Sequence, residues 1–145
     1  PTVEFRMADV CVSIDEAVML AGLIRALART CYQDACADRP FIPARAELLK
    51  AAMWQSARHG LQGDLIDFTT LQPVPAKDHV RSLLDYIKPA LEHHNDWDTV
   101  NQQVNDILTH GNSAQRQRQI YQETGCYKAV VDYLIAQGAT TLAVA

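Results

Sequence analysis

A succession of segments with helical periodicity, separated by glycine and proline, most constrains how this chain can fold. Apolar residues recur every three or four positions in these segments, which places them on one face of an α-helix. Glycine often closes a helix because it tolerates a left-handed backbone, and proline suits a helix's first turn. The pattern therefore predicts a mainly α fold of about six helices. The breaks between segments fall at Pro43, Gly60, Gly111, Gly125 and Gly138.

Capping residues set the expected ends of these helices. Ser13 and Glu16 form a Ser-x-x-Glu capping box, so the first helix is expected to begin there and to reach residue 35. Pro43 is expected in the first turn of a second helix, and Asn112 or Ser113 is expected to cap the fifth. The other predicted helices span 76–93, with a kink at Pro89, then 96–110 and 126–137.

One long stretch, residues 60–76, lacks helical periodicity. It reads GLQGDLIDFTTLQPVPA, and its glycines, prolines and threonine pair favour turns and extended chain. The letters LIDF within it predict a short strand. Irregular stretches of this length are often functional or disordered.

The opening letters PTVEFR predict a β-strand over residues 1–10. In an extended strand Glu4 and Arg6 share one face, while Val3 and Phe5 share the other. Two interpretations stay open for the charged pair. It is either an ion pair on a half-exposed sheet, or a carboxylate that binds Mg²⁺ beside a guanidinium that binds an anion. The second arrangement is what phosphoryl transfer needs, because that chemistry consists mainly of positioning and charge neutralisation.

Two other stretches contain candidate anion-binding arginines. In WQSARHGLQGDLID, Arg58 either is an exposed side chain near a packed Trp54, or reaches from a helix end toward an anionic ligand. In HGNSAQRQRQIYQETG, Arg116 and Arg118 diverge on a helix, which favours a solvated face. The alternative is an anion site at that helix N-terminus.

Composition excludes several classes of protein. The chain has 145 residues, which suits one domain, and a net charge of −4 with a pI near 5.7, which argues against nucleic-acid binding. No apolar run is long enough to span a bilayer. Four cysteines without CxxC spacing predict reduced, mostly buried thiols in a cytosolic protein, with no zinc site. The five histidines follow no metal-binding pattern.

Four stretches, taken in order, resemble the carboxylate–amine ligases of the type-2 glutamate–cysteine ligase family. They are PTVEFRMADVCVSIDEAVMLAGLIRALART, WQSARHGLQGDLID, GNSAQRQRQIYQETG and AVVDYLIAQ, so the resemblance reaches Gln137. It implies that residues 1–145 are a single, C-terminal helical region of a longer ligase. Residues 1–10 would supply a strand of an α+β, glutamine-synthetase-like catalytic sheet, residues 11–138 the helices, and residues 139–145 a tail.

The resemblance also implies a chemistry. ATP phosphorylates a carboxylate, and an amine then displaces phosphate to form an amide; γ-glutamylcysteine formation is the family's usual assignment. Glu4 matches a strand glutamate that binds Mg²⁺, and Arg6 an arginine two residues on that binds phosphate or a substrate carboxylate. Arg58 matches the family's Trp-x-x-Ala-Arg-x-Gly stretch and is taken as a substrate- or nucleotide-binding residue. Where the family often has cysteine before aspartate, this chain has Ala8 before Asp9.

The expected partners are amino-acid substrates and the N-terminal part of the same cytoplasmic protein, with no nucleic acid and no membrane. Homo-oligomer formation is left open. This chain alone is expected to be inactive, because most metal ligands would lie outside it. The competing hypothesis is a helical interaction or dimerisation module with no chemistry of its own.

Overall fold

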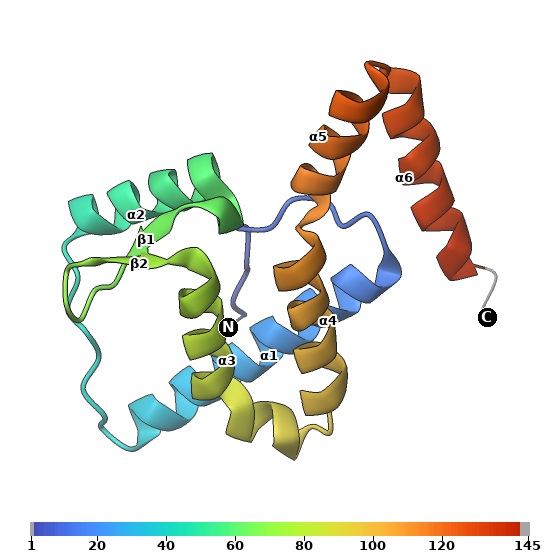
Figure 1. Ribbon diagram of the computed structural model, residues 1–145. Helices are drawn as coiled ribbons and strands as arrows, with labels where there is room; N and C mark the ends of the chain where they lie inside the picture. The colour runs from blue at the N-terminus through green and yellow to red at the C-terminus, as the bar shows by residue number, and fades with distance from the viewer. Residues whose placement is uncertain (1, 143–145) are drawn as a thin grey trace. The chain divides into compact units, whose positions relative to one another are not determined.

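A computed structural model describes the backbone of residues 2–142 and the side chains of residues 2–139. These residues form six α-helices, a short 3₁₀ helix and a two-stranded sheet (Figure 1), which confirms the mainly helical class. The elements in chain order are α1 (Ile14–Cys36), α2 (Ala46–His59), η1 (Gly60–Gln62), β1 (Asp64–Ile66), β2 (Pro73–Pro75), α3 (Ala76–His93), α4 (Trp97–His110), α5 (Ser113–Thr124) and α6 (Tyr127–Leu142).

The chain divides into two compact units. The first unit contains the residues up to Arg25 together with those from Asn95 onward, and the second unit contains Ala26–His94. The boundary falls inside α1, so this helix contributes its N-terminal half to one unit and its C-terminal half to the other.

The core of the first unit lies along α4. Its apolar residues recur every fourth position, and Val100, Val104 and Leu108 are all buried. Met19 of α1 is buried as well. The two helices approach closely at Gly22, because a Cβ added there would lie 2.7 Å from Cγ2 of Val100. A side chain larger than hydrogen therefore does not fit at this crossing.

Local hydrogen bonds explain where α1 and α5 begin. The Ser13 hydroxyl accepts from the backbone N–H of Glu16 at 3.2 Å, as the capping box predicted. The Glu16 carboxylate, however, accepts from the N–H of Val12 at 3.3 Å, one residue before the expected donor. At α5 the box is complete: the Asn112 side chain accepts from Gln115 N at 3.0 Å, and the Gln115 side chain accepts from Asn112 N at 2.8 Å.

The helices α5 and α6 follow each other through a left-handed glycine. Gly125 has φ 64°, and its N–H donates to the Tyr121 carbonyl at 2.7 Å. The rings of Tyr121 and Tyr127 stack at this junction with their centroids 4.5 Å apart. The predicted glycine stop at residue 125 is therefore confirmed.

The core of the second unit lies along α3, whose predicted bounds of 76–93 are confirmed. Leu84, Ile87 and Leu91 are buried on one face of this helix. Residues 64–75 form an antiparallel hairpin in which Leu65 pairs with Val74. The predicted strand thus begins one residue earlier than expected. The second strand was not predicted, because prolines at both its ends make such a segment a poor donor to a ladder.

Two polar contacts meet at Asp34, in the C-terminal half of α1, within the second unit; one comes from α3 and one from the loop after α1. The Tyr86 hydroxyl donates to Oδ2 of Asp34 at 2.6 Å, and Arg39 donates to Oδ1 of the same carboxylate at 2.9 Å. The hydrogen bond to Asp34 and partial burial raise the pKa of Tyr86, so this phenol stays protonated.

The predicted N-terminal strand is not present. Residues 2–12 have no strand, and residue 1 lies outside the described part. The alternation of apolar and charged residues is correct for a strand, but a strand needs a neighbour for its backbone hydrogen bonds. The only ladder among the described residues joins β1 to β2.

Two helix ends also differ from the prediction. The helix α6 runs through Gly138 to Leu142, so the tail expected from residue 139 is helical as far as it is described. Gly138 keeps a negative φ, unlike the three glycines that do close turns. Pro43 precedes the first residue of α2 by three positions instead of sitting in its first turn, and Arg45 is the N-cap.

Gly22→Ala is expected to lower the free energy of unfolding by about 1–3 kcal/mol, because the added methyl overpacks against Val100, whose β-branched side chain is stiff. Gly138→Ala is the matched control, since a Cβ there meets no atom within 4 Å. It is expected to raise the free energy of unfolding by about 0.5–1 kcal/mol, the usual gain of alanine over glycine in a helix. Urea unfolding of the two variants checks this, and a Gly22→Ala protein as stable as Gly138→Ala would contradict the close crossing.

Candidate functional site

Glu4 and Arg6 lie together on the irregular segment that precedes α1. The Nε atom of Arg6 is 3.5 Å from Oε1 of Glu4, and the two side chains are 82% and 76% exposed. An ion pair this open to water contributes little to stability. Either charged group can therefore leave its partner and bind a ligand instead.

The backbone around this pair has no regular hydrogen bonds. Within the described chain, residues 2–12 take part in no backbone ladder, and Val3, Met7 and Val10 are largely exposed. A segment of this kind offers unpaired N–H and C=O groups to an incoming strand or ligand.

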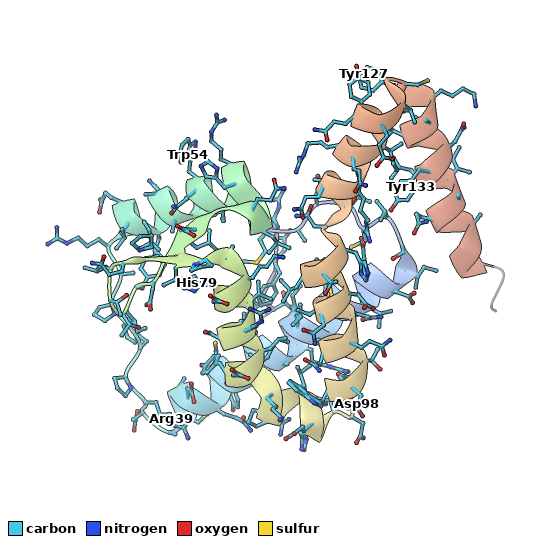
Figure 2. The ribbon with its side chains drawn as sticks, in the orientation of Figure 1. Arg39, Trp54, His79, Asp98, Tyr127 and Tyr133 are labelled. Carbon is cyan, nitrogen blue, oxygen red and sulfur yellow. The ribbon has the colours of Figure 1, made fainter. Side chains whose placement is uncertain are left out.

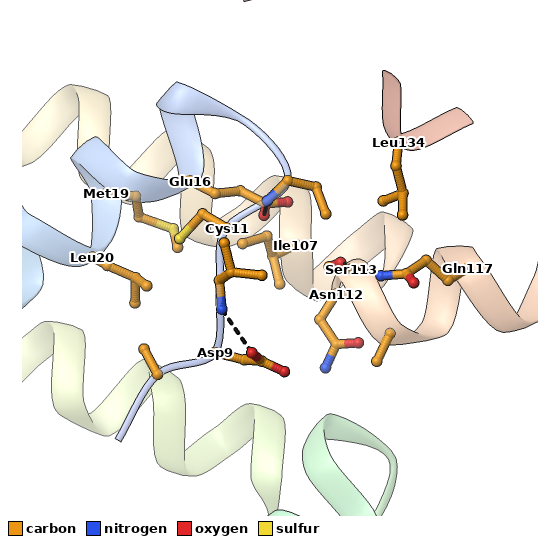
Figure 3. Close-up of a pocket in the computed structure, with 14 residues that line it drawn as sticks. Asp9, Cys11, Glu16, Met19, Leu20, Ile107, Asn112, Ser113, Gln117 and Leu134 are labelled. Atoms are coloured by element: carbon orange, nitrogen blue, oxygen red, sulfur yellow. Dashed lines mark hydrogen bonds between the residues drawn. The ribbon is translucent and has the colours of Figure 1, made fainter. Parts of the chain in front are cut away.

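A pocket of about 570 Å³ follows the charged pair along the chain (Figure 3). Its volume is typical of a small-molecule site. The wall combines polar groups with apolar side chains from the first unit. The lining residues are Ala8, Asp9, Val10, Cys11, Val12, Glu16, Met19, Leu20, Ile107, Asn112, Ser113, Ala114, Gln117 and Leu134.

Cys11 is the thiol in this pocket, and it is half-buried. Burial raises the pKa of Cys11, and the nearby Glu16 carboxylate raises it further. The protonated thiol is a poor nucleophile. The chain's other three cysteines are exposed and free, so the prediction of mostly buried thiols is wrong.

A second pocket of about 370 Å³ adjoins Glu16 and contains Arg116. The Arg116 guanidinium donates through Nη2 to Oε1 of Glu16, and these side chains are only 27% and 15% exposed. The predicted solvated face is therefore wrong for Arg116 and right for Arg118, which is exposed. Sequence reasoning missed this pair, because no local pattern links residues 100 positions apart.

Arg58 lies in the last turn of α2, in the second unit, and is exposed. Trp54 (Figure 2) is 65% exposed and meets the His59 ring edge-on, with the centroids 6.5 Å apart. The expected packed tryptophan is thus wrong. Among the predicted site residues the structure brings together Glu4 and Arg6, whereas Arg58 belongs to the other compact unit.

The donor set for a metal is small. In the part of the chain that the structure covers, no three His, Cys, Asp or Glu side chains group around a common point. Mg²⁺ usually takes one or two protein carboxylates and completes its shell with phosphate oxygens and water. Glu4 fits the role of one such carboxylate. Among the described helices none is long and apolar enough to cross a membrane.

The chain is similar to one family of proteins along nearly its whole length. Residues 1–132 match the family described as glutamate-cysteine ligase family 2 (GCS2). A protein of Frankia alni named "Putative glutamate--cysteine ligase 2-3" is 39% identical over 137 residues, which are 94% of this chain and 16% of that protein. Another of the same organism, named "Putative glutamate--cysteine ligase 2-2", is 40% identical over 97% of this chain and 37% of its own length.

A Salinispora arenicola protein named "Putative glutamate--cysteine ligase 2" is 41% identical over 94% of this chain and 36% of its own length. The chain therefore spans between 16% and 37% of the length of these relatives. No solved structure gives a significant match. The match over residues 1–132 shows that this chain belongs to glutamate–cysteine ligase family 2.

Proposed function

We propose that the protein carrying this chain is an ATP-dependent carboxylate–amine ligase of the glutamate–cysteine ligase type. A carboxylate is phosphorylated by ATP to an acyl-phosphate, and the amine displaces phosphate to leave an amide. The observation that carries this proposal is the match of residues 1–132 to the family, which includes Glu4 and Arg6. The exposed ion pair supports it. Water screens the attraction between the two opposite charges, so both charges are available for ligands.

Each member of the pair takes a separate task in this proposal. Glu4 supplies one oxygen ligand to Mg²⁺, which neutralises phosphate charge when it is bound with ATP. Arg6 offers its planar fork to a phosphate or a substrate carboxylate. Arg58 is proposed to bind substrate or nucleotide.

The larger pocket is proposed to hold the rest of a small amino-acid substrate. Arg6 precedes Ala8, the first lining residue, by two positions, and two extended residues span at most about 7 Å. A carboxylate bound by Arg6 can therefore belong to a molecule whose apolar part occupies the pocket. The polar groups Asp9, Asn112 and Gln117 are placed to orient such a molecule.

The relatives' greater length supports a further part of the proposal. The chain corresponds to the C-terminal part of the ligase, and other parts of the protein supply further metal ligands and most of the nucleotide site. The segment 2–10 joins a glutamine-synthetase-like sheet there as a strand, which would pair its backbone and set Glu4 and Arg6 on one face.

A helical interaction module is the second candidate function. Exposed apolar side chains on α2 and α6, among them Met53, Trp54 and Ile135, favour it. Exposed apolar side chains on a helix are typical of a surface that another protein segment covers. This candidate predicts that no substitution at Glu4 or Arg6 alters any chemistry.

Glu4→Gln and Arg6→Lys, each made in the complete ligase, are expected to lower kcat/KM by at least about 100-fold, which corresponds to about 2.7 kcal/mol of transition-state stabilisation. The first removes the metal-binding charge, and the second removes the two-pronged fork. The thermal midpoint is expected to stay within error of wild type, because both side chains are exposed. Extra Mg²⁺ should partly restore Glu4→Gln but not Arg6→Lys.

Asp85→Asn and Arg118→Lys are the matched controls for these charge changes. Asp85 on α3 and Arg118 on α5 are exposed, and neither lines the 570 Å³ pocket. Their steady-state kinetics should equal those of wild type. Near-normal kinetics for either Glu4→Gln or Arg6→Lys would show that the segment is scaffold and that the site assignment is wrong.

The 145-residue chain by itself is expected neither to hydrolyse ATP nor to join glutamate to cysteine. Its described part offers one carboxylate at the proposed metal site and no group of three potential ligands. Phosphate release and product formation, followed by coupled assay and mass spectrometry, test this. Turnover above that of a Glu4→Gln control would overturn the proposal that the site is shared with the rest of the protein.

A further inference from the structure

The carboxylate of Glu16 connects three parts of the first unit. Its Oε2 accepts from the N–H of Val12 at 3.3 Å, which fixes the end of the irregular segment. The backbone N–H of the same residue, Glu16, donates to the Ser13 hydroxyl, which caps α1. Its Oε1 accepts from the guanidinium of Arg116 on α5. One side chain therefore joins the irregular segment, α1 and α5.

We propose that the Glu16–Arg116 ion pair is a clamp that fixes the width of the 570 Å³ pocket, and that Arg116 is a positioning residue for the molecule bound there. The first half of this proposal concerns the fold of this chain alone. The second half rests on the proposed ligase function.

The walls of the pocket show why the pair has this effect. One wall consists of residues 8–12 and the start of α1, including Glu16 itself (Figure 3). The opposite wall includes Asn112, Ser113 and Gln117 at the start of α5. Arg116 lies on α5 between these lining positions, so its bond to Glu16 holds the two walls together.

Taken together, the side chains of the Glu16–Arg116 pair are less exposed than those of the other ion pairs among the described residues. The Arg25–Asp96 pair, which also joins distant residues of the first unit, has side chains 53% and 26% exposed, whereas those of Arg116 and Glu16 are 27% and 15% exposed. Removing one member of a poorly solvated pair leaves the other charge without compensation, which is strongly destabilising locally. The Nε atom of Arg116 is buried and has no hydrogen-bond partner among the described residues. The contact to Glu16 is thus the interaction that holds this guanidinium.

Cys11 provides a readout that does not depend on catalysis. It lines the pocket and is half-buried, whereas Cys126 of the same unit is exposed. Alkylation by iodoacetamide, followed at each cysteine by mass spectrometry, therefore reports access to the pocket. The Glu16 charge influences the pKa of Cys11, so the rate is measured across pH; the high-pH plateau reports access alone.

Arg116→Met is expected to raise the plateau rate at Cys11 by about fivefold or more, the factor that corresponds to roughly 1 kcal/mol of easier local opening. The rate at Cys126 should not change. Arg116→Lys keeps a positive charge within reach of Glu16 and should restore most of the protection. Arg118→Met, made two residues away at an exposed position, is the matched control and should behave as wild type.

The clamp is overturned if Cys11 is alkylated as slowly in a folded Arg116→Met protein as in wild type. It is also overturned if Arg118→Met speeds alkylation of Cys11 as much as Arg116→Met does. If Arg116→Met fails to fold, which loss of the helical far-UV circular dichroism signal would reveal, Glu16→Gln decides. That variant keeps an oxygen acceptor for Val12 and removes only the charge. Selective exposure of Cys11 supports the clamp, and unchanged protection overturns it.

The positioning role is tested by kinetics in the complete ligase. Arg116→Met should raise KM for one substrate by about tenfold while kcat changes less, because uniform substrate binding is lost. A fall in kcat alone, in proportion to the folded fraction, would overturn the positioning role. If the wild-type ligase joins no acid and amine while Cys11 responds as expected, the proposed function fails and the clamp stands.

Discussion

The first unit depends most on a carboxylate that is kept largely away from water. Glu16 caps the turn before α1 through Val12 and binds Arg116, so the direction of the irregular segment and the position of α5 are set by the same group. Electrostatic attraction is stronger where water is excluded, and a charge left alone there is costly. The pocket beside Glu16 therefore exists with its present walls only while this pair is intact.

The two ion pairs have different roles: one is available for chemistry, and the other stabilises the structure. Glu4 and Arg6 face open solvent, where screening makes their mutual attraction small and leaves each group able to bind something else. Glu16 and Arg116 are largely withdrawn from solvent and are committed to each other. A chain with this division can lose the exposed pair without unfolding, whereas the partly buried Glu16–Arg116 pair supports the shape of the site.

Local rules predicted the helices well, because their signals are local. Ser13, Asn112 and Gly125 act within one turn of the helix end that they mark, and α3 was placed correctly from apolar periodicity and its flanking residues. Gly138 misled the prediction, because glycine permits a stop without requiring one. For the candidate site, the sequence predicted the Glu4 and Arg6 pair but not the role of Arg116. That role depends on a side-chain contact between α1 and α5, 100 positions apart in the chain, which no periodicity encodes.

The absent strand at residues 2–10 follows from the same distinction. Its alternation of apolar and charged residues is a local property, but the hydrogen bonds that define a strand belong to a neighbour. The helical unit already fixes one end of this segment through the bond from Val12 to Glu16. In the proposed ligase a neighbouring strand has to fix only the remainder. Such pairing would convert a solvent-exposed ion pair into two charges held on one face, and this preorganisation is what electrostatic catalysis requires.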